Sequence, residues 1–332
     1  MVQLYPFLLA PQFVERVWGT RDLAPLYQHN RTPQQVPVGE VWLTGDECQV
    51  VNGSLAGYDL ATLAGRFGCD FVGEAAPRSS RFPLLIKFLF PCEKLSVQVH
   101  PDDEGAHRHG EPNGKTECWY VYSAAPGAQI ALGLKPGATL AELERAITET
   151  RAEELLNWMD VAVGDLIYVD AGTVHTIGPG SVLVEVQQNS DLTYRLYDYG
   201  RPRPLHLGKA FDVIKEKNFS GKIAPSGTNG NLNLVTAPWF VVNRRTVAEG
   251  KEHLITRHMP PYSVQIVVGL EGGGWVLAQD REPVAFSRGQ VVVVPATLNN
   301  FRVRPQKSLE YLHVTLPQDE VKVPQSLPSD QK

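Results

Sequence analysis

Residues 164–175 read GDLIYVDAGTVH, and residues 289–300 read GQVVVVPATLNN. Each stretch begins with a glycine, continues through an apolar run and a short turn segment, and ends on a polar residue, which is His175 in the first copy and Asn300 in the second. An apolar run between a glycine and a turn is typical of a buried strand. Such strands occur in any β protein, but the shared spacing indicates that one β unit occurs twice.

Further strands are predicted where Val, Ile, Leu and Tyr cluster between glycines and prolines, at residues 82–90, 95–99, 118–122, 165–169 and 182–187. Many short strands are typical of sandwiches and barrels. The clearest helix is predicted over residues 139–159, where apolar side chains recur at roughly helical spacing. Weaker helical patterns cover 54–67 and 207–217. The chain is therefore predicted to be mainly β, with a few peripheral helices.

A chain of 332 residues is longer than one hydrophobic core usually covers, so we expect two domains. Gly, Ser, Asn and Lys dominate after Lys217, which predicts an exposed connector at 218–233. The first domain then spans 1–217 and includes the helical segments. The second spans 234–320, and a polar tail follows at 321–332.

The composition, 43% hydrophobic and 20% charged with a net charge of −5, is typical of a soluble globular protein and shows no basic surface for nucleic acid or an anionic membrane. We therefore expect a small-molecule partner. The four cysteines form no CxxC pair, which favours reduced thiols and a cytoplasmic location. The N-terminus lacks the basic start of a signal peptide, and no apolar stretch is long enough to span a membrane.

A metal site is predicted by Gln98 and His100, which are two positions apart and so share one face of the predicted strand 95–99. Glu117 and His175 lie beside other β-rich segments and could converge on the same divalent ion. Two imidazoles, a carboxylate and a weak amide ligand suit zinc and leave room for water or substrate. If His100 stood alone, it would be interpreted as a surface histidine or as a hydrogen-bonded structural one. The nearby His107 and His109 are expected to lie in a solvated loop.

Several charges lie near these ligands in the sequence. Lys87 interrupts the apolar run 82–90, and burial of an unpaired ammonium is too costly without a partner or ligand. Lys115 precedes Glu117 by two residues, while Asp191 and Arg195 follow the strand after His175. Such groups beside a metal suit proton transfer on an anionic, phosphorylated molecule. Ordinary ion pairs at a barrel rim are the alternative.

Five blocks in this order resemble the signature blocks of the type I mannose-6-phosphate isomerases: PLLIK at 83–87, LSVQVHPD at 95–102, GKTECWY at 114–120, AGTVH at 171–175 and QQNSDLTYRLYD at 187–198. The compact length and the segment LHLGKAFDVI at 205–214 are similar to the shorter bacterial form. The repeated pattern at 164–175 resembles the second motif of the cupin superfamily, whose fold is a small jelly-roll barrel with a metal site in its mouth.

This resemblance implies two cupin-type jelly-roll β-barrels. It implies one zinc ion per chain in the first barrel, held by Gln98, His100, Glu117 and His175, with Gln98 the weakest ligand. The second barrel is expected to hold no metal, because Asn300 stands at the ligand position of its motif. Arg195 matches the family's active-site arginine, and the pocket-lining residues are implied to be Lys87, Ser96, Lys115 and Asp191.

The implied activity is aldose–ketose isomerisation, the interconversion of mannose 6-phosphate and fructose 6-phosphate by zinc-assisted proton transfer through a cis-enediol. Lys115 and Asp191 are the expected proton-transfer groups, and Arg195 is expected to bind the phosphate or the developing oxyanion. Three alternatives remain: a metal-binding cupin that acts as a sugar-binding or regulatory protein, an isomerase of an unphosphorylated sugar, and a metal-dependent dioxygenase. The oligomeric state is not predicted.

Overall fold

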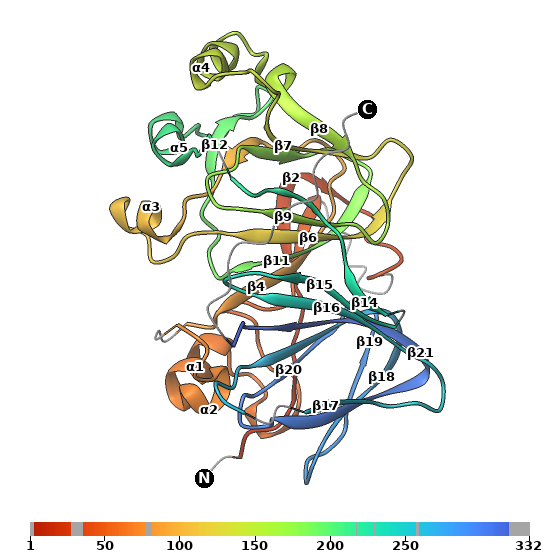
Figure 1. Cartoon of the computed structure of the whole chain (residues 1–332). Helices are drawn as coiled ribbons and strands as arrows, with labels where there is room; N and C mark the ends of the chain where they lie inside the picture. Colours follow the sequence, from red (N-terminus) through yellow and green to blue (C-terminus); the bar gives the residue numbers. More distant parts are fainter. Residues whose placement is uncertain are drawn as a thin grey trace.

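The computed structural model describes residues 3–27, 36–77, 81–216, 218–228, 230–256 and 259–318. The tail expected at 321–332 lies outside these residues. Within them the chain forms three antiparallel sheets with short helices at the periphery (Figure 1), which confirms the prediction of a mainly β fold. None of the helices in this part of the chain is long and apolar enough to cross a membrane.

Two sheets face each other and form what we call the first barrel. The seven-stranded sheet has the order β13 (Gly221–Ile223), β9 (Leu166–Val169), β6 (Glu117–Ala124), β11 (Ser181–Gln188), β4 (Leu84–Leu89), β3 (Val38–Trp42) and β2 (Gln12–Thr20). The five-stranded sheet has the order β12 (Tyr194–Tyr197), β5 (Val97–Val99), β10 (His175–Ile177), β7 (Gln129–Leu134) and β8 (Leu156–Asp160). Apolar side chains of both sheets, such as Val121, Ile130 and Ile177, pack in one cluster between them.

The third sheet curls around a separate apolar cluster and forms the second barrel. It contains β1 (Phe7–Leu8), β14 (Ser226–Thr228), β15 (Asn231–Thr236), β16 (Val241–Val247), β17 (His253–Thr256), β18 (Gln265–Ala278), β19 (Val284–Ser287), β20 (Val291–Val294) and β21 (Asn300–Thr315). Val267, Val292 and Phe301 are among the buried residues of this cluster.

The central strands of the seven-stranded sheet are buried on both faces. In β4, β6 and β11, Leu89, Trp119 and Leu183 point into the first barrel. Their neighbours Phe88, Tyr120 and Val184 pack on the opposite face, in a cluster that extends into the second barrel. Because side chains alternate along a strand, polar residues in phase with the first set lie inside the first barrel.

Parts of the N-terminal 76 residues pack on the second barrel rather than on the first. Phe7 of β1 is paired with Val293 of β20. The amide nitrogen of Ala296 donates to the carbonyl oxygen of Phe71 at 2.9 Å, beside the short helices α1 (Leu60–Phe67) and α2 (Cys69–Val72). The two barrels therefore share one continuous core, which a division of the chain at residue 217 does not separate.

The repeated sequence pattern has a structural counterpart. β9 covers 166–169 and β10 begins at His175, while β20 covers 291–294 and β21 begins at Asn300, at the same spacing. The glycine that starts each copy adopts a positive φ, 90° at Gly164 and 79° at Gly289. A glycine adopts this conformation without the steric cost that a side chain adds.

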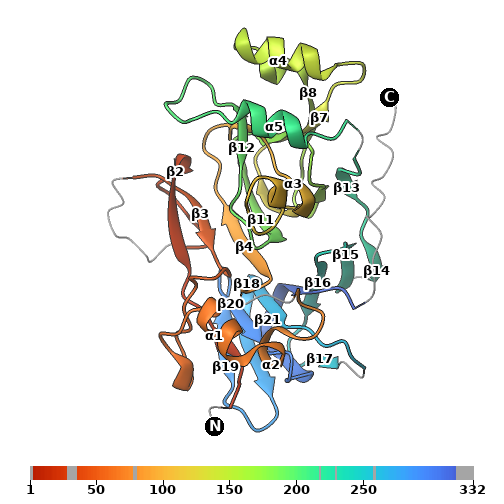
Figure 2. The same ribbon diagram turned by 90° about the vertical axis from the view of Figure 1, so that its left-hand side faces the viewer.

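Helices flank the sheets (Figure 2): α3 (Asp103–Arg108), α4 (Leu140–Thr148) and α5 (Leu207–Val213) lie against the first barrel, and α1 and α2 lie beside the second. The helix predicted over 139–159 is too long. It ends at Thr148, Thr150 takes a φ of 58°, and the chain continues as a 3-10 turn (Ala152–Leu155) and as β8. β8 pairs with β7, and its Leu156 and Trp158 pack in a cluster with Leu143 and Ile147 of α4 instead of extending the helix. The patterns at 54–67 and 207–217 contain shorter helices, with a 3-10 turn (Gly53–Leu55) before α1.

The segment 218–233, predicted to be an exposed connector, is mostly exposed or half-exposed over its described residues and leads from the seven-stranded sheet to the third sheet, but parts of it form strands. β13 pairs with β9 in the seven-stranded sheet, and β14 pairs with β15 in the third sheet. Its small polar residues are compatible with edge strands, because an edge strand has one neighbour and one exposed side.

Candidate metal and substrate site

Three potential metal ligands meet at the mouth of the first barrel. Glu117 begins β6, His175 begins β10, and His100 directly follows β5. One ligand atom from each lies within 4.8 Å of the others, and all three side chains are buried. Glu117 Oε1 is buried and has no hydrogen-bond partner among the described residues. Two imidazole nitrogens and a carboxylate oxygen that lacks a donor form a set that fits a divalent ion.

The backbone orients both imidazoles. His100 Nδ1 lies 2.8 Å from the carbonyl oxygen of Leu192, and His175 Nδ1 lies 2.9 Å from that of Thr173. A carbonyl oxygen only accepts, so each Nδ1 carries the proton and each Nε2 presents its lone pair to the cluster. This is the arrangement by which outer contacts fix metal-binding histidines.

Gln98 lies next to this triad. It is paired with His175 across β5 and β10 and with Arg195 across β5 and β12. Its Oε1 accepts from Ser96 Oγ at 3.1 Å, and its Nε2 lies 3.2 Å from His175 Nε2. In this orientation the amide nitrogen faces the triad, so the amide must turn over before Gln98 can offer an oxygen ligand.

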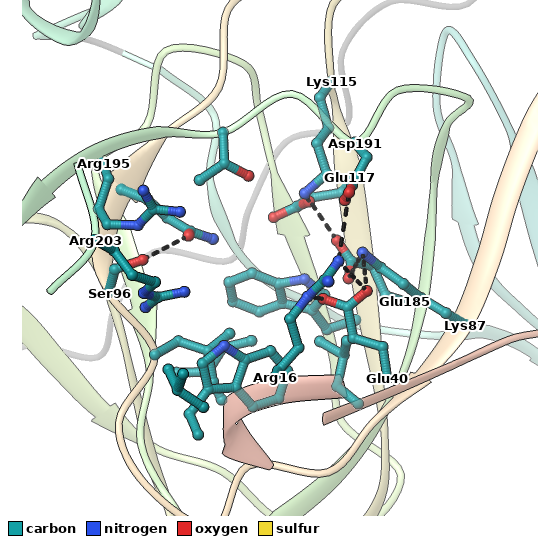
Figure 3. Close-up of a pocket in the computed structure, with 18 of the residues that line it drawn as sticks. Arg16, Glu40, Lys87, Ser96, Lys115, Glu117, Glu185, Asp191, Arg195 and Arg203 are labelled. Carbon is teal, nitrogen blue, oxygen red and sulfur yellow. Dashed lines mark hydrogen bonds and ion pairs between the residues drawn. The ribbon is translucent and has the colours of Figure 1, made fainter. Parts of the chain in front are cut away.

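Buried lysines and glutamates alternate beside Glu117 of the triad (Figure 3). Lys115 Nζ lies 2.8 Å from His100 Nε2 and 3.1 Å from Glu185 Oε1, and it also bonds Glu117 Oε2. Lys87 Nζ lies 3.3 Å from Glu185 Oε2 and 3.4 Å from Glu40 Oε2. Lys87 and Glu185 are direct neighbours across β4 and β11, so strand register alone brings them together.

The charges continue to the rim through Arg16 on β2. Its Nε bonds Glu40 Oε1 at 3.0 Å, and its Nη2 lies 3.4 Å from Asp191 Oδ2. The Trp42 indole also donates to Glu40, at 2.7 Å. Asp191 is half-exposed, whereas Glu40 is buried. The row of alternating charges thus extends from the buried triad to the solvent.

Burial and neighbouring charge shift several pKa values. Burial, together with the Lys115 ammonium, lowers the pKa of His100 well below its usual value and that of His175 to about 4, so both stay neutral. Burial and the nearby Glu185 carboxylate raise the pKa of Glu117. Burial opposes ionisation of Glu185, but Lys115 and Lys87 outweigh it and lower its pKa. Glu185 is therefore a buried carboxylate that remains ionised.

Glu117, Glu185, Lys115 and Lys87 line a cavity of about 400 Å³, which is large enough for a small sugar phosphate, whereas His100 and His175 are not among its lining residues. The cavity wall brings together all the predicted substrate and catalytic residues, which are Lys87, Ser96, Lys115, Asp191 and Arg195, and it also includes Gln98 and Glu117. His107 and His109 lie elsewhere, on and directly after α3, where His109 contacts Tyr194 and Asp212.

Sequence reasoning missed Glu185, Glu40 and Arg16. Glu185 could have been found from the sequence, because it interrupts the apolar run VLVEV at 182–186 in the same way that Lys87 interrupts the run at 82–90. Two opposite charges, each in a strand that is almost entirely buried, indicate that these strands are neighbours. Arg16 had no such signal, since β2 is of mixed polarity and partly exposed.

The sequence is similar to those of known proteins. Residues 7–121 match the model of a family described as phosphomannose isomerase type I, catalytic domain. The chain is 32% identical over 311 residues to a mannose-6-phosphate isomerase of Streptococcus mutans, covering 90% of this chain and 94% of that protein. It is 41% identical over 222 residues to the mannose-6-phosphate isomerase ManA of Bacillus subtilis, covering 63% of this chain and 68% of that protein.

A solved structure is similar as well. The crystal structure of the mannose 6-phosphate isomerase from Bacillus subtilis superposes with a TM-score of 0.82 at 30% sequence identity. The superposition covers 94% of this chain and 99% of that one. The similarity therefore includes both barrels.

Proposed function

The chain belongs to the type I mannose-6-phosphate isomerases, a family of aldose–ketose isomerases, and from this premise we propose how its cavity interconverts mannose 6-phosphate and fructose 6-phosphate. The observation that carries the proposal is the convergence of His100, Glu117 and His175, of which Glu117 lines the cavity together with a row of buried lysines and glutamates. A protein that only binds sugar has no need of such a row.

The metal in this proposal is one zinc ion per chain, which His100, Glu117 and His175 would hold, and Gln98 would be a fourth, weaker ligand through its amide oxygen. When bound, zinc supplies Lewis-acid polarisation of the sugar oxygens or of a bound water. The residues of the chain supply the rest. The proposed location of the enzyme is the cytoplasm, because its four cysteines include no CxxC pair, which favours a reducing compartment.

The reaction moves one proton between C1 and C2 and a second between the two oxygens, through a cis-enediol. Lys115 is the proposed proton-transfer group next to the metal ligands, because its ammonium lies between His100, Glu117 and Glu185. Glu185 stays ionised and positions Lys115 and Lys87. Asp191 is the proposed second proton-transfer group, at the rim, where Arg16 holds it.

Arg195, Lys87 and Ser96 are the proposed substrate-binding residues. Their cationic and hydroxyl groups line the cavity, where Arg195 can balance the charge of an anionic sugar, and Lys87 and Ser96 can contact the sugar oxygens. Gln98 is paired with Arg195 on one strand and with His175 on another, so substrate and metal contacts meet across a single strand, β5.

The test measures bound zinc and turnover in the same samples. Glu117→Ala and His175→Ala should lower the zinc content well below one per chain, while Arg195→Ala should retain zinc and lose turnover by about a hundredfold or more. Arg302→Ala, on the exposed face of the second barrel, is the matched control and should change neither. Full zinc content in both ligand variants would refute the ligand set, and unchanged kcat/KM in Arg195→Ala would remove Arg195 from the mechanism.

A further inference from the structure

We propose that Arg203, with Arg195 beside it, binds the phosphate group of the substrate and thereby makes the enzyme specific for a phosphorylated sugar. This assignment rests on the function proposed above. It concerns a residue outside the sequence blocks at 187–198 and 205–214, and it separates phosphate recognition from proton transfer within one cavity.

The cavity has two chemically different ends (Figure 3). At one end Lys87, Lys115 and Arg16 are interleaved with Glu40, Glu117, Glu185 and Asp191. Each cation there already contacts a carboxylate, so this end has little free positive charge for an anion. At the other end Arg195 and Arg203 lie beside Ser96.

Arg195 has no carboxylate within ion-pair distance among the described residues. Its Nη1 donates to the carbonyl oxygen of Pro204 at 2.8 Å, and its Nε is buried without a hydrogen-bond partner in the described part of the chain. Its backbone is fixed by His206, whose Nδ1 accepts from Arg195 N at 3.1 Å. A buried donor without an acceptor is costly and indicates a missing ligand or water.

Asp198 fixes the orientation of the Arg203 guanidinium. Its Nε and Nη2 each bond a carboxylate oxygen of Asp198 at 2.6 Å, and Asp198 is buried. A bidentate contact uses one edge of the guanidinium and leaves its other donors for a second acceptor. The guanidinium is therefore oriented before a ligand arrives, which reduces the entropy lost on binding.

Electrostatics at this end favours an anion. Burial and the neighbouring Arg203 charge lower the pKa of Arg195, and Arg16 adds to this effect. Two guanidinium groups close enough to repel each other are stabilised by a doubly charged group between them. A phosphate monoester fits, since its oxygens accept several N–H donors and match the planar fork of arginine.

Arg201 provides a matched control. It also bonds Asp198, at 3.2 Å, but its second partner is Glu93 on the surface, and it does not line the cavity. Arg203→Leu and Arg201→Leu thus both remove one arginine from the same carboxylate. Only the first removes a group that faces the substrate.

The experiment uses the zinc-loaded protein. Arg203→Leu should raise KM for mannose 6-phosphate by about ten- to a hundredfold with kcat within about threefold, because one charge-assisted contact is lost in ground state and transition state alike. Turnover of unphosphorylated mannose, measured at high concentration, should be unchanged. Arg201→Leu should leave both substrates unaffected, and Arg203→Lys should recover part of the loss.

Binding of inorganic phosphate, measured by calorimetry, gives a readout that does not depend on isomerase activity. The wild type and Arg201→Leu should bind phosphate, and Arg203→Leu should bind it at least about tenfold more weakly. Equal phosphate affinity in the two leucine variants, or equal losses for mannose 6-phosphate and mannose, would overturn the assignment. A wild type that binds phosphate through Arg203 but isomerises no sugar phosphate would instead refute the proposed function alone. If Arg203→Leu does not fold, Arg203→Lys answers the same question through its KM.

Discussion

At the scale of single residues, the candidate site contains two buried lysines that each lie between two carboxylates. Lys115 contacts Glu117 and Glu185, and Lys87 contacts Glu185 and Glu40. Ionised groups are tolerated in a barrel interior only when paired in this way. Glu185 contacts both lysines, so its removal leaves two buried ammonium groups with one partner fewer.

We therefore expect Glu185→Gln to lower kcat by about a hundredfold or more, because Lys115 loses the carboxylate that positions it for proton transfer. The free energy of unfolding should also fall by about 3–5 kcal/mol, the usual effect of breaking a buried pair. Steady-state kinetics and urea unfolding measure the two effects. Glu252→Gln removes an exposed partner of Arg302 and Arg304 and should leave the free energy of unfolding nearly unchanged. A Glu185→Gln enzyme with wild-type kcat would contradict the account.

Glu40 gives a prediction about pH. Burial disfavours its charge, but Lys87 and Arg16 outweigh burial and hold its pKa below the ordinary 4.5. A carboxylate with a lowered pKa stabilises the fold fully above its unfolded pKa, and this contribution is lost as pH falls through the folded pKa. Glu40→Gln should therefore be less stable than wild type at pH 7, by about 3 kcal/mol.

This gap should narrow as pH falls below about 4.5, where the wild-type carboxylate begins to lose its advantage. Urea unfolding at neutral and acidic pH gives the comparison, with Glu47→Gln, an exposed glutamate, as the control. A gap that stays constant over this range would mean that the charge of Glu40 is not what stabilises the site.

Much of the site follows from residue types at particular spacings. Gln98, His100, Glu117 and His175 could be selected because each lies on or next to a recognisable strand. The partner of Lys87 could be anticipated as a carboxylate but not identified, because strand order is a long-range property that local patterns do not contain. The amide orientation of Gln98 depends on Ser96 and is visible only in three dimensions.

At the scale of elements, the strands were easier to predict than the ends of helices. β4 is apolar except for Lys87, and valines and a leucine recur along the first six residues of β11, so composition marks both strands. α4 ends at Thr148, although leucines continue at helical spacing to residue 156. Leu156 instead packs in an apolar cluster with residues of β5 and β12. Tertiary packing therefore overrides helical periodicity in this segment.

The start of α4 is defined by its sequence. Thr139 Oγ1 accepts from Glu142 N at 3.2 Å, and Glu142 Oε2 accepts from Thr139 N at 2.8 Å, which is a capping box. Thr139→Ala should lower the free energy of unfolding by about 1 kcal/mol and leave kcat/KM unchanged, because α4 does not line the cavity.

Thr148→Ala, at the other end of α4, is the control. Its hydroxyl only bonds back to the carbonyl oxygen of Glu144, a contact that does not stabilise helices. Thermal unfolding of both variants measures the difference. Equal stability losses would show that the capping box adds nothing specific.

At the scale of the whole molecule, the two barrels are joined by a common core. Phe71 of α2 is fully buried, and its ring lies 5.5 Å from that of Phe7 and 5.7 Å from that of Phe82, measured between centroids. Phe7 belongs to the third sheet, whereas Phe82 precedes β4 of the first barrel. The sequence indicated two β units, but this shared packing arises from N-terminal residues that return to the C-terminal barrel.

We expect both barrels to unfold as one unit and Phe71→Ala to destabilise them together by about 3–5 kcal/mol. Hydrogen exchange of the buried amides of β11 and β18 should show an equal loss of protection in this variant. Phe219→Ala, which truncates an exposed ring, should leave both strands protected. Loss of protection confined to one barrel would show that they are independent.

The central claim is that the metal held by His100, Glu117 and His175 is required for the isomerisation of mannose 6-phosphate. The most direct measurement is the rate of fructose 6-phosphate formation by one preparation as purified, after chelation, and after stoichiometric zinc is returned. The account predicts that activity disappears with the metal and returns with about one zinc per chain. Full activity in protein shown by elemental analysis to be free of metal would contradict it.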